Sequence, residues 1–276
     1  GMVLEGWINQ RGEMLRQELG MGLVAIRETE TQARAGTLPR NTGADLVGTT
    51  MIPISGLPAD LRGRAILRLR YAGADLSTFE LADGRQTVSG HQIEIRKESV
   101  RPGIALPVTA PEYAQALSSD PLVQSSHPRI IERAQRIIGK TTDSVDAARQ
   151  ILAWVYGNLK KDLVVGVPSA LETLDARVGD CNEHSTLFAA LGRSIGLPTR
   201  MVVGLVYSKG QFGYHAWNEI LTSDGWLTVD ATWNQMPVDV GHLAFLRGGL
   251  SEQVRLLPLM GRLSLKLDGS PKPELP

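Results

Sequence analysis

The chain has 276 residues, of which 42% are hydrophobic, so it can bury one large core or two smaller ones. Its 29 Lys and Arg residues balance 29 Asp and Glu residues, and a net charge of zero gives no global electrostatic reason to expect binding to nucleic acid or to a membrane surface. No apolar run is long enough to predict a membrane-spanning helix, and the single cysteine excludes an internal disulfide and a cysteine-rich zinc site.

Residues 1–110 predict an all-β accessory domain. Short runs of mixed apolar and polar residues recur between turn signals, at a spacing typical of a sandwich or a small barrel. These runs include residues 23–32, 49–54, 64–71, 76–81 and 92–96. Arg68 and Arg70 alternate with leucines, which favours a solvated sheet face over a binding patch. No nucleophile–base pattern stands out here, so we expect a scaffold, a cleft wall or a surface for partner recognition.

A proline-rich stretch, residues 101–111, marks the predicted boundary to a second domain of residues 111–265. Apolar periodicity predicts helices over 112–117 and 128–138, and a longer helix that Asp143 caps. The remaining residues, 266–276, form a polar, proline-bearing tail whose last part, from Ser270, we expect to be disordered. The chain starts without a signal peptide, and a Gly before the first Met is typical of a tag remnant. The compartment stays open, and we favour an exported or periplasmic protein whose leader has been removed.

The only cysteine, Cys181, lies at the start of a predicted helix. Gly179 and Asp180 form a turn signal, apolar residues at helical spacing follow, and residues 196–198 (GLP) stop the helix. Unpaired backbone N–H groups and the positive end of the helix dipole favour the thiolate there. The same groups can bind an oxyanion, and the N–H of Cys181 is the first candidate donor. Trp154 and Asn158 are candidates for the second donor.

A predicted hairpin places a histidine beside an aspartate. Residues 215–220 and 226–230 alternate in polarity and flank an Asp-Gly turn signal. We expect His215 at the start of the first strand and Asp230 at the end of the second. Because the start of one hairpin strand lies beside the end of the other, the two side chains are predicted to be neighbours.

A thiol, an imidazole and a carboxylate are the groups that a cysteine nucleophile needs. We therefore predict Cys181 as nucleophile, His215 as base and Asp230 as the acid that orients the imidazole. The competing interpretation of each is structural: a small core residue, a hydrogen-bonded histidine and a strand cap. His184 lies on the same helix face as the cysteine and is a rival base, which we interpret as structural or cleft-lining.

No metal or cofactor is predicted. A zinc site made of Cys181, His184, His215 and Asp230 matches no metal-binding spacing, and no acidic loop predicts calcium. The remaining histidines lie in turn-like or polar contexts and receive no functional role; they are His91, His127 and His242.

Four ordered blocks of sequence resemble the core of the transglutaminase-like superfamily. They are GDC at the predicted helix start, GLPTR before a predicted strand, HAWNEI and GWLTVDATW. The resemblance covers roughly residues 125–250 and implies an α+β, papain-like fold, in which a nucleophile helix packs on an antiparallel sheet that carries the histidine and the acid. It implies the same catalytic residues, Cys181, His215 and Asp230. It also suggests structural or cleft-lining roles for Arg200, Trp217, Trp226 and Trp233.

The implied function is a cysteine-dependent acyl-transfer enzyme that acts on peptide or amide bonds of a peptide or protein substrate, through a thioester on Cys181. Discharge of the thioester by water gives a peptidase or amidase, and discharge by an amine gives a cross-linking transglutaminase. The resemblance to bacterial sequences favours hydrolysis. The alternative is a catalytically silent binding or scaffold protein, although all three chemical residues are present. The substrate and the oligomeric state stay open.

Overall fold

The computed structural model describes residues 6–9, 14–20, 23–29, 31–32, 51–162, 168–248, 252 and 254–268. Contacts divide the chain into two compact units, Gly1–Thr49 and Thr50–Pro276. The disordered end predicted from Ser270 lies outside the described residues. Among those residues, none of the helices has the length and apolar character needed to cross a membrane. The boundary near residue 110 and the exported location stay predictions.

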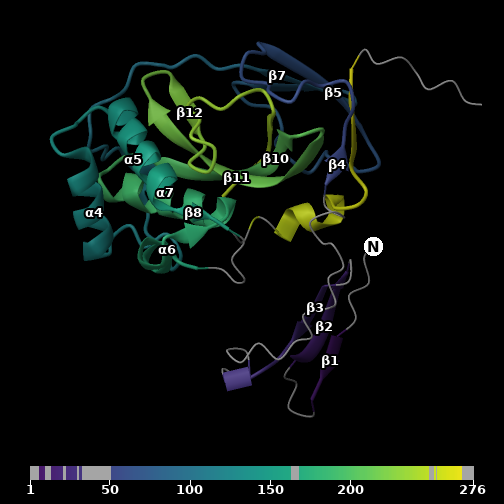
Figure 1. Ribbon diagram of the computed structural model, residues 1–276, viewed down its shortest axis with the longest axis horizontal. Coiled ribbons are helices and arrows are strands. Elements are labelled where there is room, and N and C mark those ends of the chain that lie inside the picture. The colour runs from purple at the N-terminus through teal and green to yellow at the C-terminus, as the bar shows by residue number, and fades with distance from the viewer. Residues whose placement is uncertain are drawn as a thin grey trace, which may run out of the picture. The chain divides into compact units, whose positions relative to one another are not determined.

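The first unit contains a three-stranded antiparallel sheet of order β1-β2-β3 (Figure 1). Its strands are β1 (Gly6–Ile8), β2 (Met14–Gly20) and β3 (Leu23–Ile26). Trp7, Leu15 and Ile26 are exposed, and the guanidinium of Arg16 lies 4.9 Å from the centre of the Trp7 ring. The strand-rich start of the chain is confirmed.

The second unit is built on a five-stranded antiparallel sheet. Four strands follow the order β12-β11-β10-β13, and the short strand β4 pairs with the first residues of β11. The strands are β4 (Ile52–Pro53), β10 (Thr199–Ser208), β11 (Gln211–Thr222), β12 (Gly225–Val229) and β13 (His242–Arg247). The antiparallel sheet is confirmed, but the prediction that His215 starts its strand is wrong. Lys209 and Gly210, both with positive φ, make the whole turn, so β11 begins four residues before His215.

Helices cover one face of this sheet, on the left of Figure 1. They are η1 (Pro111–Tyr113), α3 (Ala114–Leu117), α4 (Pro128–Ile138), α5 (Ser144–Asn158), α6 (Ala170–Ala176) and α7 (Cys181–Ser194). Asp143 caps α5 as predicted, accepting from the N–H groups of Val145 and Asp146. Two short parallel strands, β8 (Lys160–Lys161) and β9 (Val178–Gly179), pair with each other, and β9 ends two residues before α7 begins. The side chains of α5 and α7 share a core with the sheet, which places the predicted nucleophile helix directly against β11.

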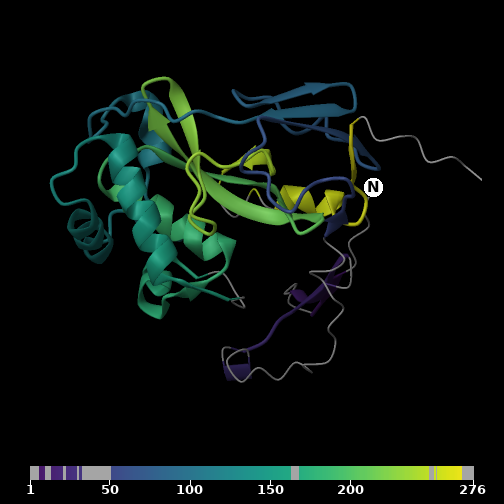
Figure 2. The ribbon, with the colours of Figure 1, turned by 45° about the horizontal axis from the view of Figure 1, so that its top comes forward.

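A second antiparallel sheet, of order β14-β5-β7-β6, shares a hydrophobic core with the first sheet (Figures 1 and 2). It consists of β5 (Ile66–Ala72), β6 (Gln86–Ser89), β7 (Gln92–Arg96) and β14 (Ser264–Leu267), the last following η2 (Val254–Leu259). Leu67 and Ile93 share one hydrophobic core with Leu205 and Phe245 of the first sheet. The strand predicted over residues 76–81 is wrong, because these residues form turns.

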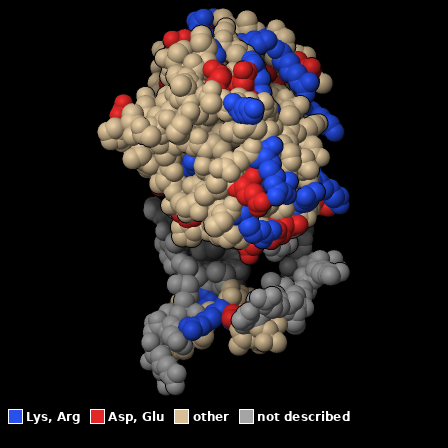
Figure 3. All heavy atoms as spheres, turned by 90° about the vertical axis from the view of Figure 1, so that its left-hand side faces the viewer, with Lys and Arg blue, Asp and Glu red and all other residues tan. Residues whose placement is uncertain are grey.

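The charged surface follows the alternation predicted for β5. Arg68 and Arg70 are exposed and pair with Glu94 and Asp268, while Leu67 and Leu69, which alternate with them, are fully buried. On the side where α4 and α5 lie, basic and acidic side chains also stand next to one another (Figure 3). The ion pairs of these helices are Arg129–Asp175, Arg136–Glu132 and Arg149–Asp146. These faces therefore combine charges of both signs.

Candidate active site

Cys181 is the first residue of α7, as predicted, and a capping box fixes that helix start. The Oδ1 atom of Asp180 accepts from the N–H of Asn182 at 2.8 Å, and the Oε2 atom of Glu183 accepts from the N–H of Asp180 at 2.8 Å. Gly179 leaves room for Glu183, because a Cβ atom at Gly179 would lie 2.3 Å from the Cβ atom of Glu183. The sequence around the cysteine therefore has a physical explanation. Gly179 leaves space for the Glu183 side chain, and Asp180 and Glu183 cap the helix.

Glu183 is a buried carboxyl group two residues after the nucleophile candidate. Burial raises the pKa of Glu183 to about 7, against the opposing hydrogen bond from the backbone N–H of Asp180. This carboxyl group therefore changes charge near neutral pH, beside the first turn that carries Cys181.

His215 and Asp230 are direct neighbours, which confirms the geometry predicted from the hairpin. The Nε2 atom of His215 lies 2.9 Å from the Oδ2 atom of Asp230, and both side chains are buried. Cys181 also interacts with the His215 ring and is one of the groups that raise its pKa. Since Nε2 faces Asp230, Nδ1 is the ring nitrogen left for the sulfur. The fold thus brings all three predicted residues together.

Electrostatics favour the charged forms of both His215 and Asp230. Burial by itself lowers the pKa of His215, but the charge and hydrogen bond of Asp230, together with the contact to Cys181, raise it to about 10. Burial likewise raises the pKa of Asp230, yet the neighbouring histidines hold it well below the ordinary value of an aspartate. An imidazolium beside an ionised Asp230 is therefore the favoured charge state of these two residues.

Asp230 has hydrogen-bond partners on both carboxylate oxygens. Its Oδ1 atom accepts from the N–H groups of Thr232 at 2.7 Å and Trp233 at 3.2 Å. Its Oδ2 atom faces His215 and also the Nε2 atom of His242, at 3.1 Å. The turn-like or polar context expected for His242 is wrong: the residue begins β13, and its ring is fully buried against the predicted acid. The signal that sequence reasoning passed over is a histidine opening the apolar run of residues 242–246, where a buried ring needs a polar partner.

Two of the tryptophans singled out in the sequence flank the His215 ring. Trp217 lies 6.1 Å away and nearly parallel, and Trp233 lies 5.5 Å away at 39°. Both rings also contact His242, so they enclose the histidines and keep their surroundings apolar.

Comparison with known proteins places this site in a family. Residues 131–231, which include Cys181, His215 and Asp230, match the family model described as the transglutaminase-like superfamily. This region belongs to the transglutaminase-like superfamily. A relative from Haemophilus influenzae, described as an uncharacterized protein, is 30% identical over 96 residues, which are 30% of this chain and 26% of the relative. The chain therefore spans only about a quarter of that relative's length.

The solved structures that are similar to this chain have low identity to it. A structure from Cytophaga hutchinsonii, described as a candidate cysteine protease, is 13% identical with a TM-score of 0.48, covering 73% of this chain and 83% of the other. The periplasmic domain of TgpA from Pseudomonas aeruginosa is 15% identical with a TM-score of 0.39, covering 69% and 91%. Red sea bream transglutaminase is 16% identical with a TM-score of 0.29, covering 48% and 27%.

The rival base of the transglutaminase-like core, His184, is bound to its own helix. Its Nδ1 atom lies 2.7 Å from the carbonyl oxygen of Asp180, the ring is fully buried, and burial lowers its pKa. The two candidates for a second oxyanion donor also have other contacts. Asn158 donates its amide to the carbonyl of Trp154, and the guanidinium of Arg133 covers the Trp154 ring. These contacts favour structural roles for all three.

The described residues include one group with metal-ligand geometry. One ligand atom each from His215, Asp230 and His242 lies within 4.8 Å of the others. However, the same three atoms already form the hydrogen bonds from both rings to Oδ2 of Asp230. The zinc set considered from the sequence differs, because it contained His184 and not His242. We assign no metal here.

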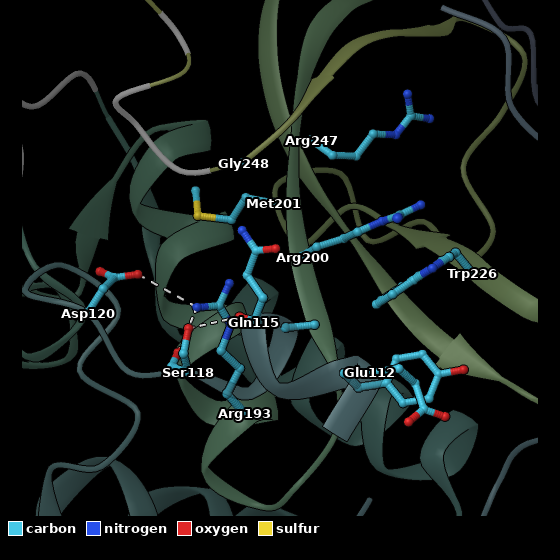
Figure 4. Close-up of a pocket in the computed structure, with 12 residues that line it drawn as sticks. Glu112, Gln115, Ser118, Asp120, Arg193, Arg200, Met201, Trp226, Arg247 and Gly248 are labelled. Atoms are coloured by element: carbon cyan, nitrogen blue, oxygen red, sulfur yellow. Dashed lines mark hydrogen bonds and ion pairs between the residues drawn. The ribbon is translucent and has the colours of Figure 1, made fainter. Parts of the chain in front are cut away.

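A separate cavity of about 450 Å³ lies at the other end of the nucleophile helix (Figure 4). Arg193, near the end of α7, lines it and is held by Ser118 and Asp120, so the cavity is about 18 Å along the helix from Cys181. The guanidinium of Arg200 stacks 4.0 Å from the centre of the Trp226 ring and binds Glu219 at 2.5 Å. Arg200 and Trp226 line this cavity, whereas Trp217 and Trp233 flank His215.

Proposed function

We propose that this protein is a cysteine-dependent acyl-transfer enzyme that acts on peptide or amide bonds, with Cys181 as nucleophile, His215 as base and Asp230 as orienting acid. The observation that carries the proposal is the hydrogen bond between His215 and Asp230 beside Cys181, with the cysteine at the N-terminus of a 14-residue helix. Superfamily membership supports a cysteine-dependent enzyme in general. The specific residues and the reaction are our inference.

The reaction starts from a thiolate–imidazolium pair. The Sγ atom of Cys181 attacks the carbonyl carbon, and the oxyanion receives the backbone N–H of Cys181 at the helix N-terminus. His215 then gives its Nδ1 proton to the leaving amine, and a thioester remains on the cysteine. His215 next takes a proton from water as that water attacks the thioester. Collapse releases a carboxylic acid and restores the charged pair.

Hydrolysis is the favoured outcome, and peptides or proteins are the proposed substrates. The same three side chains also support attack of the thioester by an amine, which gives cross-linking. Incubation with a glutamine-containing protein and a fluorescent primary amine separates the two. Peptide release without incorporation of the amine supports hydrolysis, whereas incorporation at a comparable rate contradicts it.

The test of the proposed site is the rate at which iodoacetamide alkylates the only cysteine, measured against pH. Wild type is compared with His215→Ala and with a control, His91→Ala, whose ring contacts only Tyr71 among the aromatic side chains. We expect fast alkylation that persists to about pH 6, where an ordinary thiol is almost inert, in wild type and in the control. The His215→Ala variant should lose it.

The opposite result favours the alternative, a catalytically silent binding or scaffold protein. That result is an alkylation rate in wild type that rises with pH like an ordinary thiol and does not change in His215→Ala. Because the chain has a single cysteine, intact-mass measurement assigns every alkylation event to Cys181.

A further inference from the structure

The segment between β12 and β13 holds His242 between two carboxylates. Its Nε2 atom lies 3.1 Å from Oδ2 of Asp230, and its Nδ1 atom lies 3.2 Å from Oδ1 of Asp239. Carboxylate oxygens accept hydrogen bonds and do not donate them, so the ring supplies the proton in the contact with Asp230. His242 therefore fills the remaining acceptor position on the oxygen that also faces His215.

Asp239 is fixed in turn by its own neighbours. Its Oδ1 atom accepts from the N–H of Gly241 at 2.9 Å, and its Oδ2 atom accepts from the side-chain amide of Gln235 at 3.0 Å. Asp239 thus lies at the outer end of a buried chain of hydrogen bonds that passes through His242 to Asp230. Removal of one donor in such a chain leaves a buried acceptor unsatisfied.

Two residues at the start of β6 hydrogen-bond the backbone around His242. The buried guanidinium of Arg85 donates to the carbonyl oxygens of His242 at 2.9 Å and Asp239 at 2.7 Å. The side chain of Gln86 donates to the carbonyl oxygen of Ala244 at 3.0 Å and accepts from its N–H at 2.6 Å. The backbone on both sides of the His242 ring is therefore tied to residues that lie more than 150 positions earlier in the chain.

We propose that His242 is a positioning residue of this enzyme. It holds the Oδ2 side of Asp230 so that this oxygen stays aligned with His215, and the start of β6 holds His242 through Arg85 and Gln86. The inference rests on the proposed function, because it assigns His242 a role in preparing the same Cys–His pair. His242 touches the acid and not the thiol, so its effect passes through Asp230.

The test compares two substitutions at one position. His242→Phe keeps an aromatic ring between the tryptophans but removes both nitrogens, whereas His242→Gln keeps an N–H donor for Asp230. We expect alkylation of Cys181 by iodoacetamide at pH 6 to slow about tenfold in His242→Phe, the effect of losing one hydrogen bond to a buried charged group. In His242→Gln it should stay within about threefold of wild type. Equal rates in the two variants overturn the proposal.

A second readout is independent of thiol reactivity. NMR of ¹⁵N-labelled protein reports the His215 ring proton that bonds Asp230. We expect this signal to shift or to be lost by exchange in His242→Phe and to persist in His242→Gln. An unchanged signal in His242→Phe overturns the role of His242. Failure of the proposed function is recognised separately, by wild type and His215→Ala being alkylated at the same rate.

A third variant keeps the test decisive if His242→Phe does not fold. Asp239→Ser keeps a hydroxyl that can accept from the N–H of Gly241 in the turn, but it is too short to reach the ring of His242. We expect a rate about threefold below wild type and a displaced His215 signal. A wild-type rate together with an unchanged signal overturns the proposal.

Discussion

The Nε2 atom of His215 and the Oδ2 atom of Asp230 are 2.9 Å apart, although the two residues are separated by 15 positions in the chain. The hairpin of β11 and β12 produces this contact, because its turn lies midway between them. A local feature of the sequence, an Asp-Gly turn between two alternating runs, therefore determines the main electrostatic contact of the proposed site.

Replacement of the nucleophile separates chemistry from folding. We expect Cys181→Ala to abolish turnover and to leave the thermal unfolding temperature nearly unchanged, because Cys181 is only partly buried and the helix cap comes from Asp180 and Glu183. Peptide hydrolysis and a thermal melt measure the two effects. Residual turnover above background would exclude Cys181 as the nucleophile.

Asp230→Asn should cost much less activity than loss of the nucleophile. The amide oxygen can still accept from the backbone N–H groups of Thr232 and Trp233, so the turn is kept, but the negative charge beside His215 is lost. We expect the loss of turnover in Asp230→Asn to be about a hundredfold smaller than the loss in Cys181→Ala. Equal losses in steady-state assays would count against an orienting role for the aspartate.

Glu183 should make stability depend on pH near neutrality. Burial raises its folded-state pKa to about 7, above the ordinary value of 4.5, so between these values the folded chain binds more protons than the unfolded chain. The free energy of unfolding should therefore fall as pH rises from about 4.5 to about 7. Glu183→Gln keeps an amide for the capping box and removes this dependence. Urea denaturation at several pH values measures it, with the surface variant Glu112→Gln as control; the same slope in wild type and Glu183→Gln would refute the assignment.

Gly179→Ala tests whether packing sets the position of the cysteine. The added methyl group would lie 2.3 Å from the Cβ atom of Glu183, so the backbone before the helix must move. We expect a loss of roughly 1–3 kcal/mol in stability, typical of overpacking, together with slower alkylation of Cys181. Gly157→Ala, where no atom lies within 4 Å of the added carbon, is the matched control. A Gly179→Ala protein with wild-type stability would show that the contact relaxes freely.

Chelation should not affect the site. Both histidine rings bond Oδ2 of Asp230 directly, so we expect dialysis against a chelator to change neither the unfolding temperature nor the rate of Cys181 alkylation. Elemental analysis of the purified protein should find less than stoichiometric zinc. A stoichiometric metal whose removal lowers the unfolding temperature would contradict this expectation.

Short-range signals in the sequence predicted the helix start at Cys181, the cap at Asp143 and the proximity of His215 to Asp230. They failed where distant residues decide the conformation. Gly210 and Gly213 both look like loop residues, but Gly213 lies within β11, where the Met51 side chain packs so closely that a Cβ atom would lie 2.7 Å from its sulfur. No local sequence pattern predicts the contact between Met51 and Gly213.

His242 was missed for the same reason. Its partners are Asp230 and Asp239 nearby and Arg85 at a separation of 157 positions, and only the folded sheet pair brings them together. The catalytic roles of Cys181, His215 and Asp230 stay predictions until the thiol is tested. The hydrogen bond between His215 and Asp230 stands independently of the resemblance.

The core shared by the two sheets limits how this protein can be shortened. The superfamily match begins at residue 131, yet a fragment that starts there lacks β5, β6 and β7, which cover Leu205 and Phe245. It also lacks Arg85, and with it both donors to the carbonyl groups around His242. We therefore expect residues 131–231, which match the family model, to be too short to fold on their own. We expect the smallest fragment with a reactive Cys181 to start near residue 50 and to include β14, and any natural transfer of this activity between proteins to carry that whole segment.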